Sequence, residues 1–347
     1  MATTDFNFQN TTKAEKVDLK DLKAMDGFTG QFHGRRNKMK TQISLIAVLV
    51  ILAAAVLLAA EPVFPQSTNG PAPGALPQLP PGQSLGIFLG IPPVPNLRDV
   101  GGYKTSDGAI VARGLAYRSD TFNPMTAEDI KKLGRLELKN DYDLRTTAEA
   151  KARPDEMPRG VHYQLLNVLA DAKSAAPAEL EALLHEPKKA NVVLGGGKIE
   201  ALFMDGYREF VSLPSAKQSY RTLFLSLMDR EKAPGVFHCT TGKDRTGWAA
   251  AALLTLLGVP KETVMADYMR TNDYTLPQFK PAIDDFVAAG GDRAIAVAVF
   301  GVKPEYLEAS FDEMQKRYGT IEGYFSEALG IDAAGQKALR DLYLDTK

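Results

Sequence analysis

One ten-residue run restricts the folds open to this chain more than any other feature: His238-Cys239-Thr240-Thr241-Gly242-Lys243-Asp244-Arg245-Thr246-Gly247. It follows a short apolar stretch, residues 233–237, that is typical of a buried strand, and it opens an apolar run, 245–258, that is typical of a helix. A helix N-terminus presents converging backbone N–H groups, and its dipole favours an anion. The sequence therefore predicts a strand–loop–helix unit built to hold an anion.

The region 95–347 shows strand-like runs that alternate with helical patterns. Strands are expected within 115–119, 136–144, 161–168 and 233–239. Thr126 is expected to cap a helix that starts at Ala127, and the tail from Lys303 predicts successive helices. This alternation indicates an α/β fold with a central sheet flanked by helices. The Ala-rich, then Gly-rich stretch 171–200 predicts a helical insertion that forms a mobile lid.

The N-terminal part has a different composition. Residues 1–40 are polar and carry eight Lys and Arg against five Asp and Glu, which is 8 − 5 = +3. Residues 43–60 are eighteen uncharged residues, all apolar except Ser44, and at about 1.5 Å each they span roughly 27 Å. A buried core helix is disfavoured because polar positions do not recur at helical spacing.

We therefore expect a cytoplasmic basic tail at 1–40 and a transmembrane signal anchor at 41–60, oriented by the basic flank 34–40. A cleaved signal peptide is the alternative. Residues 62–95 carry no charge and hold ten of the 21 prolines, so 61–94 is predicted to be an extended linker. In both cases the domain at 95–347 is expected outside the cytoplasm, periplasmic or extracellular, and secreted if the leader is cleaved.

Charge and cysteine content exclude several classes of function. The net charge is 41 − 42 = −1, which disfavours a nucleic-acid binder. The single cysteine excludes a disulfide framework and a multi-thiolate metal site, and the four histidines are scattered. No metal and no cofactor are expected.

The chemistry predicted for the loop begins with Cys239. A thiol at a helix N-terminus near cations has its pKa lowered from about 8.5 to roughly 3.5–7.5, which favours the nucleophilic thiolate. The loop from Cys239 to Arg245 can wrap a tetrahedral anion, with Arg245 gripping two phosphate oxygens. Attack of sulfur on phosphorus gives a cysteinyl-phosphate that water hydrolyses. Thr246 is expected to hydrogen-bond the sulfur, and His238 to orient the loop.

The run His-Cys-x-x-Gly-Lys-Asp-Arg-Thr-Gly resembles the signature loop of the cysteine-dependent protein tyrosine phosphatases. More narrowly, it resembles the bacterial branch typified by mycobacterial protein tyrosine phosphatase B. Other blocks over residues 95–345 are similar to that branch: 96–102, 118–120, 143–145 with Glu149, 266–273 and 301–319. The resemblance implies a phosphatase α/β fold, activity on phosphotyrosine and no metal. In some members it implies activity on phosphoserine, phosphothreonine or phosphoinositides.

Carried over by residue, Cys239 matches the family nucleophile and Arg245 the phosphate-binding arginine. Thr240, Thr241, Gly242 and Lys243 are expected to bind the substrate phosphate. Lys243 resembles a lysine in loops of lipid-directed phosphatases, so it either contacts a second phosphate or lowers the thiol pKa by its charge.

The general acid is left open by the sequence. The Trp-Pro-Asp motif of larger tyrosine phosphatases is absent, and the single tryptophan, Trp248, follows the loop. Asp244 is the first candidate and Asp171 the second. Asp99 is a third, and it is expected rather to pair with Arg98.

The predicted function is hydrolysis of phosphotyrosine, extending to phosphoserine and phosphothreonine, with a phosphorylated protein as partner. One alternative is a phosphatase of phosphoinositides or other small molecules. A second is a catalytically dead phosphate-binding module, disfavoured by the intact Cys239 and Arg245. An arsenate reductase or sulfurtransferase is a third, and a reductase would need resolving thiols that the chain lacks.

Overall fold

The computed structural model describes residues 90–172 and 183–345. A five-stranded sheet has the order β1-β3-β6-β4-β5, with β1 antiparallel to β3 and the other pairs parallel. A separate antiparallel pair joins β2 to β7. The strands are β1 Arg98–Asp99, β2 Ile110–Val111, β3 Ala116–Ser119, β4 Asn140–Asp143, β5 His162–Leu165, β6 Gly235–His238 and β7 Leu344–Asp345.

Helices make up most of the remainder. Those before the loop are α2 Ala127–Leu133, η3 Gly134–Leu136, α3 Thr147–Ala152, α5 Pro187–Leu194, α6 Lys198–Ser212, α7 Pro214–Leu227 and η4 Arg230–Lys232. Those after it are α8 Arg245–Leu256, α9 Lys261–Met269, α10 Thr271–Gln278, α11 Lys280–Ala288, α12 Arg293–Phe300, α13 Pro304–Tyr318, α14 Ile321–Gly323, η5 Tyr324–Ala328 and α15 Ala333–Tyr343. The expected α/β fold with a flanked central sheet is confirmed.

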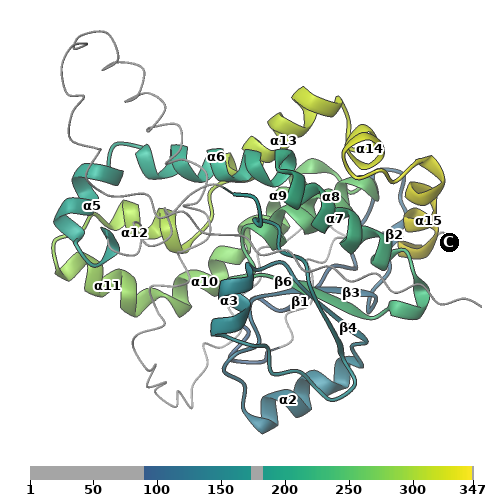
Figure 1. Cartoon of the computed structure of the whole chain (residues 1–347), viewed down its shortest axis with the longest axis horizontal. Coiled ribbons are helices and arrows are strands. Elements are labelled where there is room, and N and C mark those ends of the chain that lie inside the picture. The colour runs from purple at the N-terminus through teal and green to yellow at the C-terminus, as the bar shows by residue number, and fades with distance from the viewer. Residues whose placement is uncertain (1–89, 173–182, 346–347) are drawn as a thin grey trace, which may run out of the picture. The chain divides into compact units, whose positions relative to one another are not determined.

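The sheet is covered on both faces (Figure 1), with α2 on one face and α6 to α9 on the other. Successive strand residues point to opposite faces, so Val236 packs with Leu133 of α2 while Phe237 packs into the larger core with Trp248 of α8. Eleven of the twelve residues of α8 are buried, because this helix lies between the sheet and an outer layer of helices. The loop before α8 is thus fixed at both ends in the core.

Several predicted elements are confirmed at their expected places, and one is corrected. Thr126 caps α2 with a reciprocal capping box, and α13 follows Lys303 directly. The strand expected within 136–144 is shorter, because Leu136 ends a short 3-10 helix and Glu137 has a left-handed backbone with φ of 51°. Pairing in the sheet starts only at Asn140.

The predicted lid falls partly on residues 173–182, which lie outside the described residues. The described part contains α5, which packs on α6 and α12, and Gly195–Gly197 join α5 to α6. The mobile lid therefore stays a prediction.

The predicted tail at 1–40, the membrane span at 41–60 and nearly all of the linker at 61–94 also lie outside the described residues. In the described ranges, 90–172 and 183–345, the helices are too short or too polar to cross a bilayer. Ile91 and Val94 are buried in the smaller core, so packing of the domain begins a few residues before Pro95.

Candidate active site

The anion-binding loop predicted from the sequence connects β6 to α8. Strand β6 is the middle strand of the sheet, between β3 and β4, so chain segments following three parallel strands meet around the loop. In open α/β sheets, ligands bind at this carboxyl edge.

The loop is held by its carbonyl oxygens, which face outward. Thr240 O accepts from the Thr121 amide at 3.3 Å, Thr241 O accepts from Asn96 Nδ2 at 2.9 Å, and Gly242 O accepts from Arg118 Nη2 at 2.9 Å. In a planar trans peptide the following N–H points opposite to the carbonyl. The amides of residues 241–243 therefore face the inside of the loop, and no oxygen of the described residues accepts a hydrogen bond from them.

Gly242 is required by this path. Its φ is +66°, and an added Cβ would lie 2.4 Å from the carbonyl oxygen of Ser119. Both the left-handed backbone and the close approach to β3 exclude a side chain here.

Arg245 is buried and is held by Glu149 of α3. Its Nη1 and Nη2 each donate to one oxygen of the Glu149 carboxylate at 2.8 Å, and Nε is buried without a hydrogen-bond partner among the described residues. Burial opposes the charge of Arg245, but attraction to Glu149 and, less strongly, to Cys239 outweighs it and raises the pKa of Arg245. For Glu149, burial likewise opposes the charge, and the attraction of Arg245 lowers its pKa overall.

The sequence motif around Glu149 does not reveal its role beside Arg245, although a local signal for its position exists. Thr146-x-x-Glu149 is a capping box, and the structure shows both reciprocal bonds at the start of α3. The same carboxylate also accepts from the Thr240 hydroxyl at 2.5 Å. The cap of α3 therefore holds Glu149 in place, and Glu149 in turn holds Arg245.

Cys239 directly follows β6 and is buried, with 1% of its surface exposed. It belongs to the larger hydrophobic core, and it contributes to the raised pKa of Arg245. The expected hydrogen bond from Thr246 to the sulfur is not made. The Thr246 hydroxyl is buried and has no partner among the described residues.

Lys243 and Asp244 both point into the protein. Lys243 is fully buried, and its Nζ donates to Asp244 Oδ1 at 2.9 Å and to Gly301 O at 3.2 Å. It also stands 4.5 Å from the ring centroid of Phe203. In this arrangement its ammonium group is engaged by partners inside the protein.

Two of the three candidate acids lie at other positions of the fold. Asp171 accepts from the Ser215 amide at 3.0 Å and also from its hydroxyl, so it supports the start of α7. Asp99 does not pair with Arg98, which corrects the expectation. Its carboxylate accepts from the Gly101 and Gly114 amides at 2.7 and 2.8 Å, because neighbouring strand residues point to opposite faces.

The partner of Arg98 is Asp267 of α9, which the sequence did not reveal. Arg98 Nε and Arg118 Nη1 pair with its two oxygens at 2.9 and 2.7 Å, and the Tyr103 hydroxyl donates to it at 2.8 Å. Since Arg118 also holds the Gly242 carbonyl, α9 supports the loop through this buried carboxylate.

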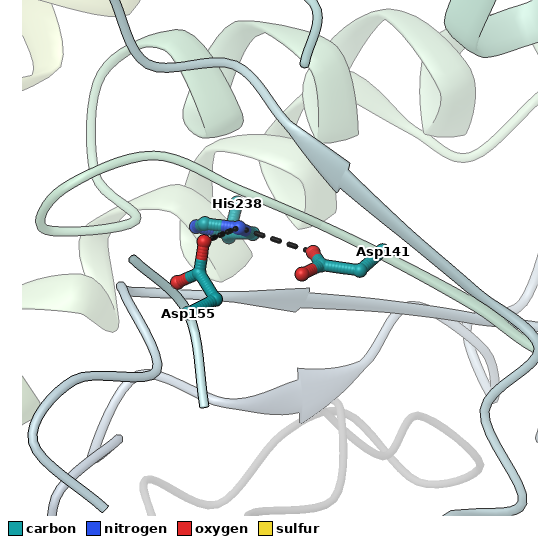
Figure 2. A group of neighbouring side chains, drawn as sticks. All are labelled: Asp141, Asp155 and His238. Carbon is teal, nitrogen blue, oxygen red and sulfur yellow. Dashed lines mark ion pairs between the residues drawn. The ribbon is translucent and has the colours of Figure 1, made fainter. Parts of the chain in front are cut away.

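His238 lies behind the loop in a buried group with Asp141 and Asp155 (Figure 2). Its Nε2 is 3.1 Å from Asp141 Oδ1 and 3.5 Å from Asp155 Oδ2, and its Nδ1 is 3.3 Å from the Cys239 carbonyl oxygen. Burial opposes its charge, but attraction to the carboxylates raises the pKa of His238 to about 10.

The Asp141, Asp155 and His238 group has the residue types and spacing of a metal site. Arg145, however, pairs with Asp155 and, at 2.7 Å, with Asp143. Arg145 and the His238 imidazolium thus already provide positive charge for these carboxylates. One ring nitrogen of His238 contacts the loop, and the other anchors the ring to the sheet.

A surface cavity of 610 Å³ lies between α3 and β5, with a lining that includes Lys151, Met157, Arg159 and Tyr163. It contains no residue of the loop. We place the candidate site at the loop, which carries the inward-facing amides, Arg245 and Cys239, rather than in this cavity.

The chain is similar to known proteins over most of its length. The chain is 29% identical over 275 residues to the triple specificity protein phosphatase PtpB of Mycobacterium tuberculosis, covering 72% of this chain and 96% of that protein. It is 28% identical over 262 residues to a protein of Cupriavidus necator whose name assigns it to the tyrosine-protein phosphatases, covering 72% and 86%. A tyrosine-protein phosphatase of Nostoc commune is 28% identical over 222 residues, covering 62% and 69%. The profile of the tyrosine phosphatase family matches residues 89–345, from before β1 to β7, and the chain belongs to that family.

Proposed function

We propose that this protein hydrolyses phosphotyrosine monoesters through a cysteinyl-phosphate formed on Cys239. The observation that carries the proposal is the orientation of the loop peptides. Their carbonyl oxygens point outward, so the amides of Thr241, Gly242 and Lys243 face inward. Such a ring of donors at a helix N-terminus matches the non-bridging oxygens of a phosphoryl group. Family membership and the names of the relatives support the same reaction.

In the proposed first step, the Cys239 thiolate attacks phosphorus as the bond from phosphorus to the phenolic oxygen breaks. The electron pair of that bond leaves with the oxygen, which takes a proton from the general acid. Water then attacks phosphorus and gives up a proton to the same residue, and the S–P bond breaks with its electron pair on sulfur, which releases phosphate and restores the thiolate. Arg245, held by Glu149, stabilises the charge on the transferred group through Nε, the guanidinium nitrogen that makes no hydrogen bond with the described residues.

We propose Asp244 as the general acid. It belongs to the loop, and its Oδ1 accepts two hydrogen bonds while Oδ2 makes none with the described residues. Asp171 has less support, because both of its oxygens are engaged by Ser215. Replacing Asp244 by Asn should slow poor leaving groups most, since they need the proton.

For substrate range, we propose phosphotyrosine with extension to phosphoserine and phosphothreonine. The relative from Mycobacterium tuberculosis is named for triple specificity, and it shares 29% identity with this chain. The phosphoinositide alternative rested on Lys243, and the buried position of that side chain does not support it.

The deciding experiment is a substrate panel on the full chain, with phosphotyrosyl, phosphoseryl and phosphothreonyl peptides and a phosphoinositide. Cys239→Ser should abolish turnover of every substrate while the protein still binds vanadate, because the loop donors remain. Arg245→Ala should lose turnover and anion binding together. Substantial turnover by Cys239→Ser would refute the mechanism, and a clear preference for the phosphoinositide would refute the proposed substrate class.

We also propose that residues 41–60 anchor the protein in a membrane with the catalytic domain outside the cytoplasm. The support is the uncharged run 43–60 and its basic flank. A reporter enzyme that works only outside the cytoplasm, fused after Lys347, should be active. If only a fusion to a reporter that works in the cytoplasm is active, the catalytic domain lies in the cytoplasm and the proposed topology is wrong.

A further inference from the structure

Asp244 has an unusual place for an aspartate at the start of a helix. It occupies the N-cap position of α8, where such a side chain normally accepts an amide hydrogen of the first turn. Here the side chain makes no capping hydrogen bond. Its Oδ1 instead accepts from the Tyr207 hydroxyl at 2.8 Å and from Lys243 Nζ at 2.9 Å. The carboxylate is thus turned from its own helix toward α6.

The direction of the hydrogen bonds at Tyr207 follows from a count of protons. Tyr207 lies 2.6 Å from the hydroxyl of Tyr268, and each hydroxyl has one proton to give. A carboxylate oxygen only accepts, so Tyr207 donates to Asp244 and receives from Tyr268. Burial, reinforced by Asp244, raises the pKa of both tyrosines well above the ordinary value, so both stay protonated.

Tyr207 is also rigidly placed. Its side chain is fully buried, its ring packs against Phe210 and Tyr306, and its carbonyl oxygen accepts from the Ser310 hydroxyl of α13 at 2.7 Å. The position of the hydroxyl is therefore set by the packing of α6 on α13. Movement of the Asp244 carboxylate would break its bond to a fixed donor.

We propose that Tyr207 is a positioning residue for Asp244, holding Oδ1 so that Oδ2 carries the proton delivered to the leaving oxygen. The two donors occupy Oδ1, while Oδ2 makes no hydrogen bond with the described residues. The inference rests on the proposed function, in which Asp244 is the general acid.

The O–H bond at Asp244 Oδ2 breaks as the P–O bond breaks, and the leaving oxygen gains the proton together with the electron pair of the P–O bond. Asp244 becomes a carboxylate that Tyr207 and Lys243 stabilise through Oδ1. In the second step Oδ2 takes a proton from the water that attacks the cysteinyl-phosphate, which restores the acid.

The test uses the full chain and the variant Tyr207→Phe, which removes the hydroxyl and leaves the ring. kcat is measured for a series of aryl phosphates, from p-nitrophenyl phosphate, whose phenolate leaves readily, to phenyl phosphate, whose phenolate leaves poorly. We expect kcat of the variant to fall about 10-fold for phenyl phosphate, the worth of one charge-assisted hydrogen bond, and to change little for p-nitrophenyl phosphate.

Tyr306→Phe is the matched control. Tyr306 is equally buried and packs against the Tyr207 ring, but its hydroxyl donates to Ala298 O and makes no hydrogen bond to Asp244. Any effect of this variant should be uniform across the aryl phosphates. Tyr268→Phe provides a second test that leaves Tyr207 in place, and it should give a smaller loss with the same dependence on the leaving group.

Asp244→Asn separates failure of this inference from failure of the proposed function. The positioning role is supported if the loss of kcat in Asp244→Asn grows steeply as the leaving group becomes poorer, and if Tyr207→Phe shows a weaker form of the same dependence. In a second outcome, the loss of kcat in Asp244→Asn depends steeply on the leaving group, but the losses in Tyr207→Phe and Tyr268→Phe are as uniform as that in Tyr306→Phe. The positioning role is then overturned, and the assignment of Asp244 as the acid stands. If Asp244→Asn shows no such dependence, Asp244 is not the acid and the inference is overturned with it.

Discussion

At the scale of single residues, Glu149 fixes the position of Arg245, the residue that we propose binds the substrate phosphate. The two side chains form a bidentate pair inside the protein, and this uses one N–H of each terminal nitrogen. When a buried arginine loses its charged partner, the free-energy cost of removing its charge from water is no longer compensated. The position of Arg245 therefore depends on a residue that never needs to touch the substrate.

Glu149→Gln should lower kcat/KM by about 10- to 100-fold and weaken vanadate binding in parallel, because the guanidinium loses its charged partner. The measurement is steady-state kinetics with vanadate inhibition. Glu308→Gln, which breaks an exposed pair with Lys261, should change neither quantity. Equal behaviour of the two variants would contradict the assigned role of Glu149.

Gly242→Ala should cost both stability and activity. The left-handed backbone alone costs about 1–3 kcal/mol in such cases, and the added Cβ would also push the loop from the Ser119 carbonyl. Gly108→Ala is the control, since its φ is +96° but a Cβ there meets nothing within 4 Å. Urea unfolding and kinetics of both variants should show that only Gly242→Ala loses activity. Full activity in that variant would argue against the loop path.

At the scale of elements, α9 is tied to β1 and β3 by one carboxylate. Asp267 pairs with Arg98 and Arg118, and these attractions overcome burial and hold the pKa of Asp267 well below its ordinary value. Arg118 in turn holds the Gly242 carbonyl. A helix outside the loop thereby fixes the orientation of a loop peptide.

Asp267→Asn should lower the free energy of unfolding by about 3–5 kcal/mol, because two buried arginines lose their partner. It should also weaken vanadate binding, because Arg118 is released from its position at Gly242. Asp284→Asn also removes a carboxylate shared by two cations, Lys280 and Arg293, but on an exposed surface, so it should cost less than about 1 kcal/mol. If both variants lose a similar free energy of unfolding, burial does not explain the contribution of Asp267 to stability.

At the scale of the whole molecule, the charged group around His238 makes stability depend on pH. The pKa of His238 is raised from 6.5 to about 10, so the folded state binds a proton that the unfolded state releases above pH 6.5. A raised pKa contributes stability that is complete below the unfolded pKa and is lost as pH rises through the folded one.

The free energy of unfolding should therefore fall by a few kcal/mol, on the order of 1.4 kcal/mol per unit, as pH rises from about 6.5 toward 10. Urea unfolding at several pH values measures this. His238→Gln should be less stable at pH 6.5 and should approach the wild type as pH rises. Parallel curves for the two proteins would show that His238 is not the group responsible.

Prediction from sequence succeeded where the signal was local. The helix cap at Thr126 and the strand–loop–helix unit at 235–256 appear at their expected places. The strand within 136–144 was predicted too long, because the left-handed Glu137 interrupts it without a sequence signal. The pairing of Asp99 with Arg98 was wrong, since sequence neighbours in a strand face apart.

The amino-acid sequence by itself determined the loop, its place between a strand and a helix, and the chemical class of ligand, because these depend on ten contiguous residues. The tertiary structure decided which groups hold that loop. Glu149 is 96 residues from Arg245, Asp267 is 169 from Arg98, and Tyr207 is 37 from Asp244. A carboxylate or hydroxyl has many equivalent copies along a chain, and only the packing of helices on the sheet selects the one that meets a given partner.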